Sequence, residues 1–107
     1  MIILSQITDN LQVVLAGNIT ATHLQCTAFW RDVTATAYTP GRSLAVTNNT
    51  TDVNLVAAPA ASPTRIIDFL SIYNADTVNA PVNIKIDASG TEYILWRGIL
   101  VTGETIQ

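Results

Sequence analysis

The stretch Arg65-Ile-Ile-Asp-Phe-Leu-Ser-Ile-Tyr-Asn-Ala-Asp76 is the longest run in the sequence with the composition of a β-strand. Its Ile, Phe and Tyr side chains favour a pleated surface, and Pro63 just before it disfavours a helix. In a regular strand, its even-numbered residues lie on one side and its odd-numbered residues on the other. Because both sides are largely apolar, the stretch predicts a central strand that packs on each face. The turn residues Asn74 to Asp76 are expected to end it.

Six further segments have strand character and are separated by turn residues. These expected strands cover 11–16, 20–33, 43–47, 52–57, 82–87 and 91–102. Pro40-Gly41 predicts a turn, and Asp87 to Gly90 predicts a hairpin loop with a positive φ at Gly90. No segment has a sustained helical period, so the sequence predicts an all-β, single-domain antiparallel β-sandwich of about seven to eight short strands. An immunoglobulin-like and a jelly-roll topology both fit, with residues 1–10 as an N-terminal arm and 11–107 as the sandwich.

The chain is sparsely charged for its size. Of its 107 residues, 49% are hydrophobic and only 12% are charged, whereas about 25% is usual. We therefore expect apolar surface that partner chains cover. The few basic residues are scattered, which argues against a nucleic-acid partner. No apolar run approaches the ~20 residues that cross a bilayer, and no basic residue precedes the apolar N-terminus, so we expect neither a membrane partner nor a signal peptide.

No combination of residues predicts catalysis. His23 and Cys26 lie three positions apart, which places them on opposite faces of a strand. We expect an exposed histidine and a buried cysteine, not a metal site or a nucleophile–base pair. Asp68 needs a cation if it is buried, and Arg65 or Arg97 is the expected partner. A strand end that meets solvent and a charge-paired subunit contact are the alternatives. The sequence therefore predicts no catalytic residues, no cofactor and no metal, and a protein that is not an enzyme.

The aromatic residues offer a second kind of site. Phe29 and Trp30 are adjacent, and so point to opposite faces of a strand; Tyr93 and Trp96 are expected to do the same. One member of each pair is therefore expected in the core. The exposed members leave open a carbohydrate-binding platform on the sandwich.

Three segments of the second half resemble small virion proteins of tailed bacteriophages. They are Val56 to Asp76, with the strand ending in Asn-Ala-Asp; the alternating Val82 to Asp87; and Gly90 to Glu104, with its Gly-Thr-Glu-Tyr start and closing Gly-Glu. The resemblance covers about half of the chain and consists of packing and turn residues. It implies a β-sandwich that decorates or cements the capsid, or that builds part of the neck or tail. It implies no catalytic residue.

These observations predict a capsid decoration or cement protein of a virion, assembled in the host cytoplasm. Its expected partners are the major capsid protein or other virion proteins, and copies of itself, with a trimer favoured. A neck, tail or baseplate component and a carbohydrate-binding module are the alternatives. Deletion of residues 1–7 is expected to weaken particle binding and to leave the fold intact. The candidate contact residues are Ile2, Ile3, Leu4, Phe29, Arg31, Tyr38 and Arg42.

Overall fold

The computed structural model describes residues 2–61 and 63–106 as an all-β sandwich of two antiparallel sheets. The predicted fold class is confirmed. Met1 and Gln107, the outer limits of the predicted arm and sandwich, lie outside the described residues. Nine strands are present in the described part of the chain: β1 Ile2–Leu4, β2 Asp9–Leu15, β3 Gln25–Val33, β4 Tyr38–Val46, β5 Val53–Val56, β6 Thr64–Tyr73, β7 Ala80–Ala88, β8 Thr91–Leu100 and β9 Thr105–Ile106.

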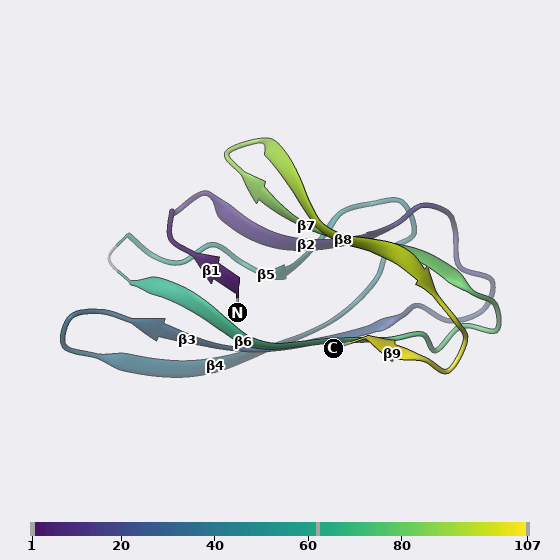
Figure 1. Ribbon diagram of the computed structural model, residues 1–107, viewed down its shortest axis with the longest axis horizontal. Coiled ribbons are helices and arrows are strands. Elements are labelled where there is room, and N and C mark those ends of the chain that lie inside the picture. The colour runs from purple at the N-terminus through teal and green to yellow at the C-terminus, as the bar shows by residue number, and fades with distance from the viewer. Residues whose placement is uncertain (1, 62, 107) are drawn as a thin grey trace.

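The chain passes repeatedly between the two layers (Figure 1). Sheet A has the order β1-β6-β3-β4, with β9 also paired to β6, and sheet B has the order β5-β2-β7-β8. Only the β3–β4 and β7–β8 connections join neighbouring strands of one sheet; each other connection crosses to the opposite layer. The stretch 65–76 contains the central strand as predicted, since β6 pairs with β3 on one side and with β1 and β9 on the other.

The core lies between the sheets and is almost wholly aliphatic. The alternation in β7 is the one predicted, because Val82 and Ile84 point inward and are buried. Burying such side chains contributes about 1.5–3 kcal/mol each. The other buried apolar residues of the core come from the strands of both sheets and from Leu24, just before β3: Leu4, Leu11, Val13, Leu15, Leu24, Cys26, Ala28, Leu55, Val56, Ile67, Ile72, Ala80 and Leu100.

A β-bulge in β6 changes which residues of the central strand face the core. Phe29 pairs with Phe69 and Trp30 pairs with Ile67, so Asp68 is an extra residue with no partner in this pairing. Inward-facing positions are therefore odd before the bulge and even after it, and Ile67 and Ile72 are both buried. The expectation of packing on both faces of this strand is wrong within this chain, since its outer face is exposed to solvent.

Residues 2–4 are a strand of sheet A and not a free arm. Ile3 pairs with Ile66, and Leu4, with an exposed fraction of 0%, lies in the core. Ile2 is partly buried against the same core. Deleting residues 1–7 would remove these contacts, so we now expect that deletion to destabilise the fold instead of leaving it intact.

Pro40 and Gly41 lie within strand β4, and the predicted turn there is wrong. The hairpin turns earlier, at Thr34 to Ala37, where the Thr34 side chain accepts hydrogen bonds from two backbone amides. Proline is tolerated because β4 is an edge strand and its missing amide lies on the open side. Gly41 is opposite Trp30, whose indole ring covers the glycine.

Gly41→Ala is expected to reduce the free energy of unfolding by about 1–3 kcal/mol. A Cβ at this position would lie 2.5 Å from the Trp30 ring, and the ring cannot move freely because its Nε1 donates to Ser43 Oγ at 3.0 Å. Chemical denaturation measures the change. Gly17→Ala is the control, since a Cβ there meets no described atom within 4 Å; equal effects of the two substitutions would contradict the packing explanation.

Candidate functional site

The outer surface of sheet A carries most of the exposed apolar side chains of that layer. Cross-strand pairs place them on one face, because directly opposite residues point the same way. Gln25 lies between Val46 and Tyr73, and Phe29 lies between Arg42 and Phe69. We call this surface the sheet A face and define it by Ile3, Phe29, Leu44, Val46, Phe69 and Tyr73.

Two phenylalanines occupy the middle strands of the sheet A face. The ring centroids of Phe29 and Phe69 are 5.4 Å apart and the rings are tilted by 35°. Phe29 is 46% exposed and Phe69 is 36% exposed. Such a pair stabilises its own geometry by about 0.5–1.5 kcal/mol, so the two rings present a preformed apolar surface. Exposed neighbouring phenylalanines on a sheet face are typical of protein contact surfaces.

The charges on the sheet A face are few. Arg31 forms an ion pair with Asp68, with 3.2 Å between Nε and Oδ2. The prediction that Arg65 or Arg97 pairs with Asp68 is therefore wrong, because its partner is Arg31. This ion pair lies on the partly exposed outer side of sheet A, where an ion pair contributes little to stability. Arg42 is exposed on the edge strand beside Phe29 and forms no ion pair within the described residues.

Five of the seven predicted contact residues lie on the same outer side of sheet A as the sheet A face. Ile3 lies opposite Ile66, which lies opposite Arg31, and Tyr38 lies opposite Val33 at the end of the same sheet. The structure brings these residues together with Phe29 and Arg42, but it places Ile2 and Leu4 on the inner side. The residues that the sequence did not identify are Leu44, Val46, Phe69 and Tyr73.

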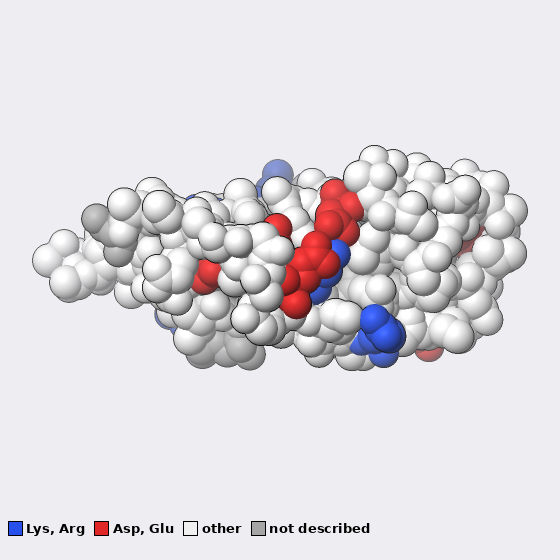
Figure 2. Space-filling model, turned by 90° about the horizontal axis from the view of Figure 1, so that it is seen from above, with Lys and Arg blue, Asp and Glu red and all other residues white. Residues whose placement is uncertain are grey.

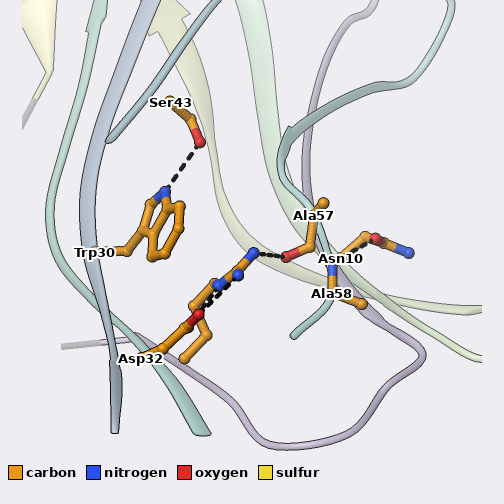
Figure 3. Close-up of polar contacts among 7 residues, drawn as sticks. Asn10, Trp30, Asp32, Ser43, Ala57 and Ala58 are labelled. Carbon is orange, nitrogen blue, oxygen red and sulfur yellow. Dashed lines mark hydrogen bonds and ion pairs between the residues drawn. The ribbon is translucent and has the colours of Figure 1, made fainter. Parts of the chain in front are cut away.

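One end of the sandwich is closed by polar contacts around Trp30 (Figure 3). The Arg65 guanidinium lies 3.9 Å from the Trp30 ring centroid and makes two bonds to the Asp32 carboxylate, at 2.8 and 3.0 Å. Arg65 also donates to the Ala57 carbonyl, in the connection that follows β5. This arginine therefore ties the two sheets together and fixes the tryptophan, so that these residues have a structural role.

As predicted, each aromatic pair has one exposed and one core member. The expectation that Tyr93 and Trp96 point to opposite faces is wrong, because the extra residue Leu95 places them opposite Ile86 and Ile84, which share the inner side. Phe29 is exposed and Trp30 packs against the core. Tyr93 is exposed, whereas Trp96 also packs against the core and its ring covers Gly98, where a Cβ would lie 2.7 Å away. Neither tryptophan is thus placed as an exposed stacking platform.

The outer surface of sheet B is different in chemistry. Figure 2 shows acidic and basic atoms meeting near the middle of this face, with further separate charged groups in the otherwise uncharged surface around them. On sheet B, Lys85 Nζ lies 2.9 Å from the Asp52 carboxylate and 2.7 Å from the Glu92 carboxylate. Burial lowers the pKa of the Lys85 ammonium, but the bonds and charges of Glu92 and Asp52 outweigh burial and the pKa is raised. The lysine is therefore a stable cation shared by two carboxylates.

Asp76 holds the loop that joins β2 to β3. Its carboxylate accepts backbone hydrogen bonds from Thr20 at 2.8 Å, Ala21 at 2.8 Å and Thr22 at 3.2 Å. Strand character was predicted from residue 20, but β3 begins only at Gln25 because this segment wraps around the carboxylate. The Thr20 bond is the main cause that lowers the pKa of Asp76 to about 2; burial opposes it, and the other amides add to it.

We expect acid to weaken the fold through Asp76. The folded-state pKa of about 2 lies below the ordinary 3.8, so this stabilisation is complete above about pH 4 and is lost as the pH falls towards 2. Asp76→Asn should have a lower Tm at neutral pH and a flatter dependence of Tm on pH between 4 and 2. Calorimetry across this range measures both, and parallel curves for the two proteins would contradict the role of Asp76.

The Cys26 thiol makes its weak hydrogen bond to the Leu24 carbonyl, at 4.0 Å, and not to His23. Cys26 is buried as predicted, and burial raises the pKa of its thiol to about 12, so that it is a neutral thiol at physiological pH. His23 is partly buried and not fully exposed as expected. The residues that the structure describes contain no group of three or more His, Cys, Asp or Glu side chains placed to hold a metal ion. They also contain no helix long and apolar enough to cross a membrane.

Comparison with known proteins gave no relative: no family model, no curated protein and no solved structure matched this chain.

Proposed function

We propose that this protein is a structural component of a tailed-phage virion, a capsid decoration or cement protein that binds the lattice of the major capsid protein. The observation that carries the proposal is the sheet A face, with Phe29 and Phe69 exposed side by side. The low charge of the chain and the resemblance of its second half to small virion proteins support the same function. Rigid binding, and no chemical step, is the activity proposed.

The sheet A face has the composition expected of an interface centre. Aromatic residues and arginine are enriched in protein contacts and contribute most of the binding energy, and here Arg42 lies directly beside Phe29. A standard interface buries about 1,600 Å² in total. The complementary surface on the shell is expected to be apolar, with a carboxylate or carbonyl group near its edge to accept hydrogen bonds from Arg42.

The rigidity of the sheet A face supports this mechanism. The contact residues lie on the paired strands β3, β4 and β6, and not on loops, so little conformational entropy is lost when a partner covers them. Weak contacts repeated over a shell would add to a stable coat, because each bound copy makes the dissociation of its neighbours less frequent.

A neck, tail or baseplate component is the alternative within the same class, and copy number separates the two. Quantitative mass spectrometry of purified virions is expected to find on the order of hundreds of copies per particle for a shell protein, and about a dozen or fewer for a tail component. Absence of the protein from purified virions would contradict both. A glycan array tests the carbohydrate-binding alternative, with Phe29→Ala as the variant, since Trp96 is packed against the core.

A further inference from the structure

Strand β8 is the one long sheet edge in the described residues that carries neither proline nor lysine. The edges formed by β1, β5 and β9 are two to four residues long, and β4 carries Pro40. β8 has ten residues, pairs only with β7, and contains neither proline nor lysine. Its side chains Ile94 and Ile99 are 51% and 67% exposed. Short length, proline, lysine and β-bulges are common means of blocking edge-to-edge association, and of these β8 has only a bulge, at Leu95.

The register of sheet B shows which backbone groups of β8 are open. Pro81 directs its carbonyl to Ala16, away from β8, so the even-numbered residues of β7 bond to β8. Their partners in β8 are Thr91, Tyr93, Trp96, Gly98 and Leu100. The amides and carbonyls at Glu92, Ile94, Arg97 and Ile99 therefore point to the open edge.

A bulge in β8 gives this edge self-complementary charge. Lys85 pairs with Ile94 and Ile84 pairs with Trp96, which leaves Leu95 as an extra residue. The shift of one residue puts Glu92 and Arg97 on the same outer side. Glu92 contacts Lys85 there, and Arg97 contacts the Asn83 side chain and no carboxylate in the described part of the chain.

We propose that β8 pairs antiparallel with β8 of a second copy, so that two copies form one continuous eight-stranded sheet. In this register Glu92 lies opposite Arg97 of the second copy, and the two-fold symmetry repeats the contact at the other end. The arginine would balance the excess charge at Lys85, where one cation faces the two carboxylates of Asp52 and Glu92. Ile94 of both copies would lie between the two ion pairs.

This pairing does not rest on the proposed function, because it uses sheet B and leaves the sheet A face of both copies free. It replaces the trimer, which the sequence alone favoured, with a dimer. Failure of capsid binding and failure of dimerisation are therefore separate results.

Sedimentation velocity and hydrogen exchange on the whole protein test the pairing together. We expect a concentration-dependent dimer, in which the amides of Glu92, Ile94 and Arg97 exchange slowly at high concentration and fast at low concentration. The amides of Tyr93 and Gly98 should stay protected at every concentration, since they bond to β7. Arg97→Glu should weaken the dimer about tenfold or more, because it replaces two attractive contacts by two repulsive ones.

Arg42→Glu is the matched control, since Arg42 is an exposed arginine of the other sheet, and it should leave dimerisation unchanged. A monomer at the highest soluble concentration, a trimer, or a dimer without slowed exchange at the amides of Glu92, Ile94 and Arg97 would overturn the proposal. Equal effects of the two arginine variants would overturn the register. If Arg97→Glu fails to fold, the exchange pattern of the unmodified protein decides the question alone.

Discussion

Replacing both Phe29 and Phe69 by serine is expected to weaken binding to the capsid shell by about 100-fold or more. Truncation of a buried aromatic anchor at the centre of an interface commonly costs about 2 kcal/mol or more, and each 1.4 kcal/mol is about a tenfold change in affinity. Co-sedimentation of the purified protein with shells that lack it gives the dissociation constant of each variant.

The same double substitution should leave the protein folded. Each ring keeps a third to a half of its surface exposed in the free chain, so the loss in unfolding free energy should be about 1 kcal/mol for their mutual contact plus part of the ~1.5–3 kcal/mol that full burial of each ring would contribute. Tyr93→Ser is the matched control, because Tyr93 is an exposed aromatic residue outside the sheet A face. Unchanged binding of the phenylalanine variant, or an equal loss with the tyrosine control, would contradict the assignment of this face as the contact surface.

Asn74→Ala is expected to cause the largest loss of stability of the substitutions considered, about 3 kcal/mol or more. The Asn74 side chain is fully buried; its amide donates to the carbonyls of Val78 and Leu100 and its oxygen accepts from the Asp76 amide. Alanine would leave these three backbone groups without partners inside the fold. Because domains of this size have a total stability of only about 5–15 kcal/mol, chemical denaturation should resolve the change clearly.

Asn79→Ala is the control for this effect. Asn79 belongs to the same group of loops, but it is exposed and its oxygen accepts one bond, from the Thr102 amide. Its removal should change the free energy of unfolding by less than about 1 kcal/mol. If the two asparagine variants unfold at the same denaturant concentration, Asn74 does not organise this end of the sandwich.

Residue alternation predicted the strands well where the register is regular. Residues 82–87 alternate strictly, and Val82 and Ile84 face the core as expected. The hairpin at Asp87 to Gly90 was also predicted, and Ser89 and Gly90 have the positive φ values, 55° and 89°, of a two-residue turn. In these segments the local sequence determines the geometry.

Predictions from residue alternation were wrong where contacts with neighbouring strands changed the register, or where they made turn-type residues compatible with a strand. Asp68 interrupts β6, and nothing in the surrounding residues distinguishes a bulge from a buried charge. Pro40 and Gly41 have turn character, but an edge position and the Trp30 ring make them compatible with a strand. Both features depend on neighbouring strands that the sequence does not specify.

The same reasoning explains which surface residues were missed. Leu44 and Val46 lie on β4, and whether they point inward or outward depends on the register with β3, in which Thr27 and Gln25 lie opposite them. Phe69 and Tyr73 were expected to pack beneath another layer because apolar residues usually do. A strand that is apolar on both sides is equally compatible with a surface that another chain covers.

Hydroxyl-radical footprinting of the protein, free and on the virion, tests the central claim most directly. The account predicts that Phe29, Leu44, Phe69 and Tyr73, which are accessible in the free chain, become protected from oxidation on the particle, while Tyr93 is oxidised to a similar extent in both states. Unchanged oxidation of the two phenylalanines in virions that carry the protein would contradict it.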